Sequence, residues 1–417
     1  MDHLSFPKAI NPSEVPTAAY IHIPFCRRRC YYCDFAVFVV GDHKDGSNSN
    51  SIQHYVEVLC TEIRQQPRWS QPLKTVFFGG GTPSLLSASQ VYQILKLVDQ
   101  QFGIASDAEI SMEMDPGTFD LEKLNAVVSA GVNRVSLGVQ AFQDRLLTVA
   151  GRSHNTQDIF TAIDHLHQAQ VNNFSLDLIS GLPHQTLEDW QQSLQAIIEI
   201  DPPHLSVYDL IVEPVTAFGR YYQPGETPLP SETTTADMYR QAQSTLTQAG
   251  YHHYEISNYA QPGFACQHNL VYWQNRPYYG LGMGAASYLQ RCRLTRPRTT
   301  QKYYDWVQSD PNPTLETDHQ TSLDILLETL MLGLRLSTGV SLTPLSQQFG
   351  EDITQEILNC LLPYQQQGWV TITTDSTLDT EIIQLTDPEG FLFSNTVLAT
   401  LFSHLSHIEL DCSTSSP

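Results

Sequence analysis

The sequence predicts an α/β protein in which parallel strands and helices alternate and wind into a barrel or partial barrel. Between about residues 18 and 212, short runs rich in β-branched and aromatic residues alternate with longer amphipathic runs, which is the pattern of repeated βα units. Right-handed crossovers between parallel strands wind such units into a barrel. Polar residues also fall near the carboxyl ends of the predicted strands, the rim at which barrel enzymes place their sites.

Six strands and five helices make up the predicted barrel. The strands are Ala18–Ile23, Thr75–Phe78, Glu109–Met114, Arg134–Val139, Phe174–Ile179 and Leu205–Leu210. The helices between them are Ser51–Gln66, Ser87–Phe102, Leu121–Ala130, Thr156–Ala169 and Leu187–Ile200. In the third strand Ser111, Glu113 and Asp115 share one face, because side chains at positions i and i+2 do so. That polar face is predicted to look inward, while the opposite apolar face meets helices.

The chain beyond the barrel mixes helical and extended patterns. Prolines and glycines mixed with aromatics in Glu213–Pro230 predict the exit from the barrel, followed by a helix at Thr233–Ala249 and an extended segment at Tyr251–Tyr259. The final third is predicted to be helical, with a hairpin of Trp369–Thr373 and Glu381–Leu385 before a last helix. The predicted domains are an N-terminal extension (1–17), the barrel (18–230), an extension (231–320) and a C-terminal winged-helix-like domain (321–417).

Charge excludes a nucleic-acid role for this winged-helix pattern. Residues 321–417 hold twelve Asp or Glu against Arg335 alone, and the whole chain carries a formal net charge of −22. Nucleic-acid affinity comes from Lys and Arg that neutralise phosphates, so a lid or docking module is the better prediction. The N-terminus lacks an export signal pattern, no 18 apolar residues run together, and the eight cysteines show no paired pattern. These observations predict a cytoplasmic protein.

Three cysteines near the N-terminus have the spacing of an iron–sulfur motif. Cys26, Cys30 and Cys33 form CxxxCxxC, which can hold three irons of a 4Fe–4S cluster and leave the fourth iron open. The position where a fourth nearby thiol could fall holds Phe35. The alternatives are a zinc site, which usually needs a second cysteine pair, or a disulfide of a small secreted domain. The other five cysteines are scattered singly, so the cluster is favoured.

Further polar and glycine motifs follow the predicted strands. The run Phe78-Gly-Gly-Gly-Thr-Pro-Ser84 at a strand end lets backbone approach a ligand closely, although Gly-Thr-Pro also makes an ordinary turn. Glu113, Gln140, Arg152 and Asp177 could supply the polar shell that a zwitterionic nucleoside needs, because a carboxylate accepts from an ammonium and Arg forks onto a carboxylate. The alternative is a salt-bridge network inside the barrel.

Together these motifs resemble the radical S-adenosylmethionine (SAM) proteins and, among them, the oxygen-independent coproporphyrinogen oxidase family. The strings that carry the resemblance are YIHIPFC from Tyr20, GGGTPS from Gly79, ExDPGT from Glu113, VSLGVQ from Val135, Gly151-Arg152 and DLISGLPxQT from Asp177. The resemblance covers almost the whole chain. It implies a partial (β/α)6 barrel with a mainly helical, winged-helix-like C-terminal region.

The same resemblance implies the cofactors and their ligands. Cys26, Cys30 and Cys33 would hold the 4Fe–4S cluster, and exchangeable SAM would chelate its fourth iron. The implied SAM contacts are Tyr20, Tyr32, Gly80, Gly81, Thr82, Glu113, Gln140, Arg152, Asp177, Ile211 and Ala286.

Two departures favour the heme chaperone branch of this family over its decarboxylating branch. The decarboxylating enzymes carry an extra cysteine two residues after the third cluster thiol and a longer N-terminal arm, whereas this chain has Phe35 there and 25 residues before Cys26. The chain also holds an HNxxYW string typical of the chaperone branch, from His268 to Trp273. The resemblance therefore implies a protein that binds heme and transfers it to an acceptor hemoprotein. The alternative is an oxygen-independent coproporphyrinogen III dehydrogenase, and whether SAM is cleaved stays open.

The heme site is predicted within the HNxxYW string. The His268 imidazole is a natural axial ligand for heme iron, and Tyr272 and Trp273 offer flat faces to a porphyrin, with Asn269 beside them. The alternative is that these residues cap a helix and fill core. Other candidate ligands are His22, His252 and His253.

Two basic runs stand out in this acidic chain. Arg291, Arg293, Arg296, Arg298 and Lys302 could meet heme propionates or form a solvated loop. The triplet Arg27-Arg28-Arg29 could raise the potential beside an anionic cluster or receive a reductant such as flavodoxin. The predicted partners are thus heme, an acceptor hemoprotein and a reductant, with a homodimer and peripheral contact with membrane-bound heme proteins left open.

Overall fold

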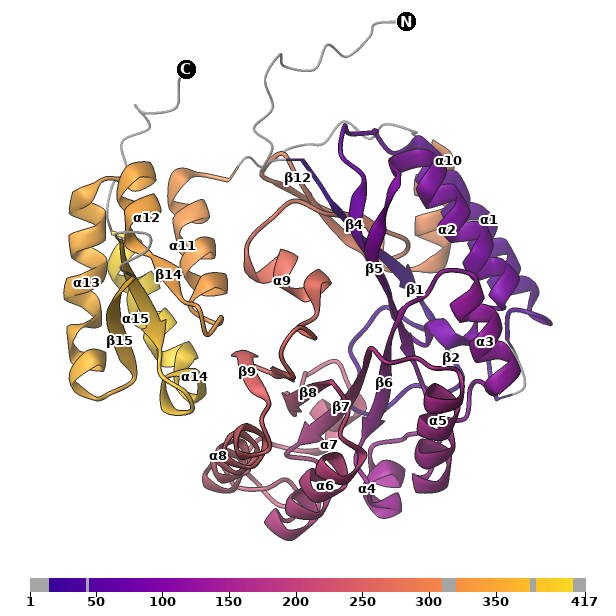
Figure 1. Ribbon diagram of the computed structural model, residues 1–417, viewed down its shortest axis with the longest axis horizontal. Coiled ribbons are helices and arrows are strands. Elements are labelled where there is room, and N and C mark those ends of the chain that lie inside the picture. Colours follow the sequence, from indigo (N-terminus) through magenta and orange to yellow (C-terminus); the bar gives the residue numbers. More distant parts are fainter. Residues whose placement is uncertain (1–14, 43–44, 310–319, 376–379, 408–417) are drawn as a thin grey trace, which may run out of the picture. The chain divides into compact units, whose positions relative to one another are not determined.

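The computed structural model describes residues 15–42, 45–309, 320–375 and 380–407, and its chain forms two compact units (Figure 1). The first unit comprises residues 1–138, 151–174 and 276–318, and the second comprises residues 139–150, 175–275 and 319–417. The predicted N-terminal extension lies largely outside the described residues. The domain boundaries proposed from the sequence stay a prediction.

The first unit is built on parallel strands in the order β11-β1-β4-β5-β6. The strands are β1 (Ala18–Ile23), β4 (Leu73–Gly80), β5 (Ile104–Met114), β6 (Arg134–Gln140, of which the last two residues belong to the second unit) and β11 (Tyr279–Leu281). Because the strands are parallel, their carboxyl ends meet at one edge. The cysteine loop after β1, the glycine run at the end of β4 and the acidic end of β5 therefore share that edge.

Five helices of the first unit accompany these strands. They are α1 (Asn50–Gln65), α2 (Ala88–Phe102), α3 (Leu121–Ser129), α5 (Thr156–Gln168) and α10 (Thr300–Ser309), with a short 3₁₀ turn η2 (Pro83–Leu85). Figure 1 shows α1, α2 and α3 in a row along the strands, and each contacts the next. Side-chain caps begin the helices: Ser87 accepts from the backbone N–H of Gln90, whose side chain in turn accepts from the Ser87 backbone.

A buried ion pair attaches the segment 276–309 to helix α1. Arg296 Nε donates to Glu62 Oε1 at 2.9 Å, and both side chains are fully buried. Glu62 Oε2 also accepts from Tyr303 Oη at 2.7 Å and from the backbone N–H of Gly282 at 2.8 Å. Arg296 is therefore part of the core. Both roles predicted for it, a contact with a heme propionate and a place in a solvated loop, are wrong for this residue. The short hairpin of β12 (Ala286–Leu289) and β13 (Cys292–Thr295) precedes it.

The second unit contains the later barrel strands and the C-terminal region. Its strands β7 (Phe174–Ser180, from Ser175 on), β8 (His204–Asp209), β10 (Asn258–Ala260) and β9 (His252–Glu255) lie in that order, with β7 and β8 parallel and β10 antiparallel to β8 and β9. Its helices in this part are α4 (Asp144–Val149), α6 (Leu187–Ile200), α7 (Ala217–Tyr221), α8 (Glu232–Gln248) and α9 (Gln267–Trp273).

The C-terminal region is mainly helical and carries a small antiparallel sheet, as predicted for a winged-helix-like fold. Its helices are α11 (Ser322–Gly333), α12 (Leu342–Phe349), α13 (Glu351–Gln366), α14 (Glu389–Leu392) and α15 (Ser394–Leu405). Strand β16 (Thr380–Leu385) lies between β14 (Val340–Ser341) and β15 (Val370–Asp375). Their apolar faces form one core that includes Leu330, Ile357 and Leu401. Arg240 of α8 contacts this region through Glu389, with Nε 2.7 Å from Oε1.

The predicted strands and helices are present in the structure, which adds others that the sequence did not predict, among them α9, α10 and β11. One predicted element differs in an informative way. The segment Tyr251–Tyr259, expected to be continuously extended, is two antiparallel strands joined by a turn. The Glu255 carboxylate closes this turn, because it accepts from the backbone N–H of Ser257 at 3.3 Å and from the side chain of Asn258. The turn of the predicted C-terminal hairpin falls at 376–379, outside the described residues. No helix within the described ranges is long and apolar enough to cross a membrane.

Candidate cofactor site

The three motif cysteines lie on one loop that leaves the carboxyl end of β1. Cys26 ends the two-residue strand β2 (Phe25–Cys26), which pairs with β3 (Phe38–Val39). Cys26, Cys30 and Cys33 are free and partly buried. The loop is closed by the backbone N–H of Cys33, which donates to the Cys30 carbonyl at 3.2 Å. Burial, with a further contribution from Asp115, raises the pKa of the Cys26 thiol to about 12.

The three motif thiols do not surround a single-ion position. Among the residues that the structure describes, no three His, Cys, Asp or Glu side chains close around a single-ion position. A cubane cluster takes one thiolate at each of several irons, so it needs thiols around a wider space. That the CxxxCxxC loop supplies such a set stays a prediction.

The glycine run at the end of β4 packs directly on this loop. A Cβ at Gly81 would lie 2.9 Å from Cys26 Sγ and 2.7 Å from the Phe25 carbonyl oxygen. Gly80 has φ +117°, and a Cβ there would lie 2.6 Å from the His22 ring. Only glycine is compatible with both positions, because a Cβ would displace backbone or Cys26 at Gly81 and the His22 ring at Gly80, where φ is also positive. The structure thus brings the cysteine motif and the glycine motif into contact.

Two carboxylates at the end of β5 hold this arrangement. Glu113 Oε2 accepts from the backbone N–H of Gly80 at 2.9 Å, which places the carboxylate beside the glycine run. Asp115 Oδ2 accepts from Thr82 Oγ1 at 3.0 Å. Glu113 was among the predicted site residues, whereas Asp115 was not. The signal for Asp115 was its place two residues after Glu113, on the same face of the strand.

Arg152 is the cation of the site. Its guanidinium forms an ion pair with Asp115, and Nη1 lies 3.4 Å from both Cys30 Sγ and Tyr32 Oη. Burial lowers the pKa of Arg152, but Asp115, Tyr32 and Cys30 raise it further, so the pKa is above its ordinary value. Its Nε is buried and, in the described part of the chain, has no hydrogen-bond partner. A buried charged donor without an acceptor fits a bound carboxylate, such as that of SAM.

Tyr20 and His22 of β1 are hydrogen-bonded to each other, and the His22 ring lies beside Gly80. His22 Nε2 lies 3.0 Å from the Ala36 carbonyl and therefore donates, so Nδ1 accepts from Tyr20 Oη at 3.0 Å. Both ring nitrogens are engaged, which leaves His22 no nitrogen for heme iron in this arrangement. Tyr55 Oη donates to the His22 carbonyl at 2.7 Å and accepts from the backbone N–H of Met283 at 3.0 Å. Ala286, at the start of β12, follows that segment in the same unit.

The remaining predicted SAM contacts belong to the second unit. Gln140 ends β6 with φ 68°, an uncommon conformation for a residue with a side chain. Asp177 lies on β7 and accepts from Ser175 Oγ at 3.2 Å. Ile211 follows β8, and its side chain is 70% exposed. That these three join the first unit's residues around one ligand stays a prediction.

The predicted heme residues lie on helix α9. His268 is fully buried, and its Nε2 lies 2.8 Å from Tyr272 Oη, one helical turn later. Asn269, Tyr272 and Trp273 are partly buried on the same helix. An imidazole nitrogen in such a bond must be released before it can bind iron. Of the alternative ligands, His253 bonds Asp387 through Nδ1 at 2.9 Å.

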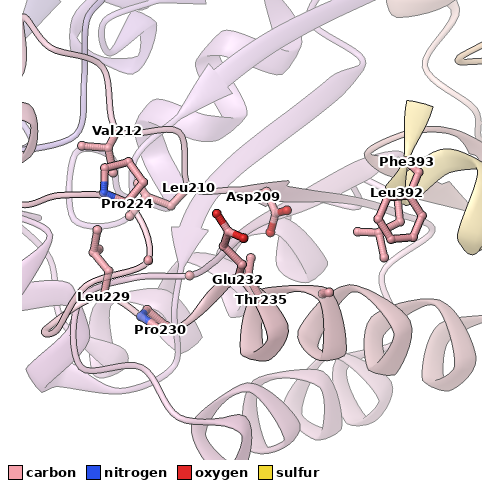
Figure 2. Close-up of a pocket in the computed structure, with 13 residues that line it drawn as sticks. Asp209, Leu210, Val212, Pro224, Leu229, Pro230, Glu232, Thr235, Leu392 and Phe393 are labelled. Carbon is pink, nitrogen blue, oxygen red and sulfur yellow. The ribbon is translucent and has the colours of Figure 1, made fainter. Parts of the chain in front are cut away.

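A pocket in the second unit lies at the end of β8 (Figure 2). Figure 2 shows the Asp209 and Glu232 carboxylates facing it, with Leu210 and Leu229 on one side and Phe393 on the other. Burial raises the pKa of Asp209, and Ser180 bonds its carboxylate. Two carboxylates disfavour the propionates of heme, since like charges repel. The pocket therefore suits an uncharged or cationic ligand better than the acidic edge of a porphyrin.

Known proteins resemble this chain over nearly its whole length. The Radical SAM superfamily matches residues 20–197, and the HemN C-terminal domain family matches residues 320–392. The heme chaperone HemW of Synechocystis sp. is 47% identical over 403 residues, covering 94% of this chain and 97% of that protein. HemW of Bacillus subtilis is 38% identical, covering 85% and 92%.

Among solved structures, the coproporphyrinogen III oxidase HemN of Escherichia coli, described as a radical SAM enzyme, has a similar fold. It matches with a TM-score of 0.79 at 25% identity, over 94% of this chain and 91% of that one. The fold class expected from the sequence, a radical SAM α/β barrel with a mainly helical C-terminal region, is confirmed.

Proposed function

The chain belongs to the HemW family of radical SAM proteins, and from this premise we propose that it is a heme chaperone. It binds heme and transfers it to an acceptor hemoprotein, and it carries a 4Fe–4S cluster on Cys26, Cys30 and Cys33 with exchangeable SAM at the fourth iron. The observation that carries the proposal is the 47% identity to a heme chaperone over 97% of that protein's length. Likeness to the oxidase is lower, at 25% identity.

The first unit's residues support the cofactor half of the proposal. The Glu113 carboxylate beside Gly80 is suited to accept from the SAM ammonium. Arg152 Nε, which has no partner among the residues that the structure describes, is suited to the SAM carboxylate. Gly80 and Gly81 allow backbone to approach the ligand, since no side chain fits there. When bound to the reduced cluster, SAM supplies radical chemistry; the protein places and orients it.

The heme half of the proposal uses α9. His268 supplies the iron ligand once its bond to Tyr272 opens, and the faces of Tyr272 and Trp273 contact the porphyrin. The cytoplasm supplies the reducing conditions that the cluster needs. A reductant such as flavodoxin would meet the Arg27–Arg29 segment, where Arg28 pairs with Asp42 and Arg27 donates to the Gly117 carbonyl.

One experiment separates the chaperone from its alternative, an oxygen-independent coproporphyrinogen III dehydrogenase. The anaerobically reconstituted protein is incubated with heme and an apo-hemoprotein, and separately with SAM, reductant and coproporphyrinogen III. We expect a heme Soret band on the protein, its transfer to the acceptor, and no protoporphyrinogen. Turnover of coproporphyrinogen, with no heme transfer, would establish the alternative. Phe35, at the position of the oxidase's extra cysteine, is 57% exposed and has no thiol to contribute.

A further inference from the structure

A chain of hydrogen bonds in the second unit runs from Asp177 to the start of helix α9, through Ser175, His204 and Tyr254. We propose that it couples SAM binding to heme binding. The inference rests on the proposed function, because it takes Asp177 as a SAM contact and α9 as the heme-binding segment. Ser175, His204 and Tyr254 are positioning residues in this scheme, since they act through Asp177 and α9.

Every link joins neighbouring strands or loops. Ser175 Oγ donates to Asp177 Oδ1 at 3.2 Å, and His204 Nδ1 lies 2.8 Å from Ser175 Oγ, across the β7–β8 pair. His204 Nε2 lies 2.8 Å from Tyr254 Oη, which follows on β9. The backbone N–H of Cys266, the N-cap of α9, donates to Tyr254 Oη at 3.3 Å. The chain therefore reaches the residue at which the His268 helix begins.

The number of protons on each group decides which partner donates in each of these hydrogen bonds. Ser175 Oγ lies near the Asp177 carboxylate, His204 Nδ1 and, at 3.4 Å, Ser206 Oγ. Its single hydroxyl proton goes to the carboxylate, the only charged acceptor of the three, so its oxygen accepts from His204 Nδ1–H and from the Ser206 hydroxyl. In a neutral imidazole Nε2 then accepts, and it takes the proton of Tyr254, whose oxygen accepts from the Cys266 amide. All donors point toward Asp177. Hydrogen bonds aligned in this way polarise one another, so the carboxylate's charge strengthens the bond at α9.

Burial protects the middle of the chain from water. Ser175 is fully buried and His204 is 1% exposed, so the bonds between them act in a low-dielectric interior. Tyr254 is fixed from a second side, because its carbonyl accepts from Ser337 N and Oγ at 3.0 and 3.1 Å. The backbone of Tyr254 is thus held in place, while the strength of the hydrogen bond from Cys266 to its hydroxyl depends on the charge of Asp177.

SAM changes that strength. Hydroxyl groups of the nucleoside that donate to Asp177 compete with Ser175 for the carboxylate charge, and the bonds along the chain weaken. The start of α9 is then held less tightly, which lowers the free energy needed to release His268 from Tyr272. Heme consequently binds more tightly when SAM is present, and by linkage SAM binds more tightly when heme is present.

The test measures heme Kd with and without SAM in the anaerobically reconstituted full-length protein. We expect SAM to lower the heme Kd of the wild type about fivefold, the lower end of typical allosteric coupling. In Tyr254→Phe, which keeps the ring but loses the hydroxyl, both ligands still bind and the effect of SAM falls below about twofold. Ser175→Ala interrupts the other end of the chain and should give the same result.

Tyr259→Phe is the matched control. Tyr259 lies on β10, is 1% exposed, and its hydroxyl has no hydrogen-bond partner within the described residues, so the effect of SAM should stay at the wild-type value. A purely structural role of the chain predicts lower melting temperatures with unchanged coupling. Coupling that is equal in wild type and Tyr254→Phe, or absent from the wild type, overturns the inference. A protein that binds neither ligand contradicts the proposed function instead.

Discussion

The cysteine loop of the first unit and helix α9 of the second carry the two most specific motifs of the chain, but they are prepared for ligands to different degrees. Around the loop, Arg152 Nε has no partner among the described residues, and the three motif thiols form no disulfide. On α9, His268 is fully buried and already bonded to Tyr272. If the proposed sites are right, the difference teaches that the SAM and cluster site is preorganised, whereas heme binding includes the cost of opening α9.

The largest effect should come from removing a cluster thiol. In Cys30→Ser the third thiolate is lost, so we expect the near-ultraviolet and visible absorption of the cluster to disappear after anaerobic reconstitution. Cys360→Ser is the control, because Cys360 is also free and partly buried but lies on α13. An unchanged cluster spectrum in Cys30→Ser would contradict the assignment of the loop.

The next largest effect concerns Arg152, the cation beside the cysteine loop. Arg152→Lys keeps the charge but loses the planar fork, so SAM should bind roughly tenfold more weakly, measured by calorimetry on reconstituted protein. Arg145→Lys changes a similar Arg–Asp ion pair, with Asp189, and should leave SAM affinity unchanged. Equal affinities in wild type and Arg152→Lys would remove Arg152 from the SAM site.

The bond between His268 and Tyr272 on α9 predicts that one substitution raises heme affinity. Tyr272→Phe removes the hydroxyl that holds His268 Nε2 but keeps the aromatic face, so heme affinity should rise about fivefold, the equivalent of one hydrogen bond. A heme titration followed by the Soret band measures this rise. His268→Ala should lose the part of the Soret band that arises from axial coordination of the heme iron by the imidazole. Weaker heme binding by Tyr272→Phe would show that the hydroxyl assists the ligand rather than restrains it.

The smallest effect depends on pH and concerns β9, which carries Tyr254. Burial raises the pKa of Glu255 from 4.5 to about 7. Between these values the folded state holds a proton that the unfolded state releases, so the free energy of unfolding falls as pH rises. Glu255→Gln should therefore be more stable than wild type by about 1 kcal/mol at pH 8 and no more stable at pH 4.5. Thermal unfolding at both pH values checks this; a gain that is equal at both would refute it.

Much of the fold and of the motif geometry could be predicted from the sequence. The strands of the barrel and the contact between Cys26 and Gly81 follow from local patterns, because hydrophobic alternation and parallel topology bring strand ends together. Asp115 could have been added, since it shares a strand face with Glu113.

Pairings between distant residues could not be predicted. Nothing local in the basic run distinguishes Arg296, which is fully buried, from its neighbours, because its partner Glu62 lies on the first long helix. The pairing of His204 with Ser175 and Tyr254 likewise depends on strand order. These contacts are set by tertiary packing, which residue type and spacing along the chain do not reveal.

The ion pair of Glu62 and Arg296 has a consequence for biosynthesis. The ribosome makes Glu62 early, but the cation that neutralises it, Arg296, follows strand β13 and emerges more than 230 residues later. Until then the carboxylate cannot be buried without a large desolvation cost. The first unit should thus stay open on the ribosome until residue 296 has left the exit tunnel, and nascent chains released before that point should be sensitive to proteases.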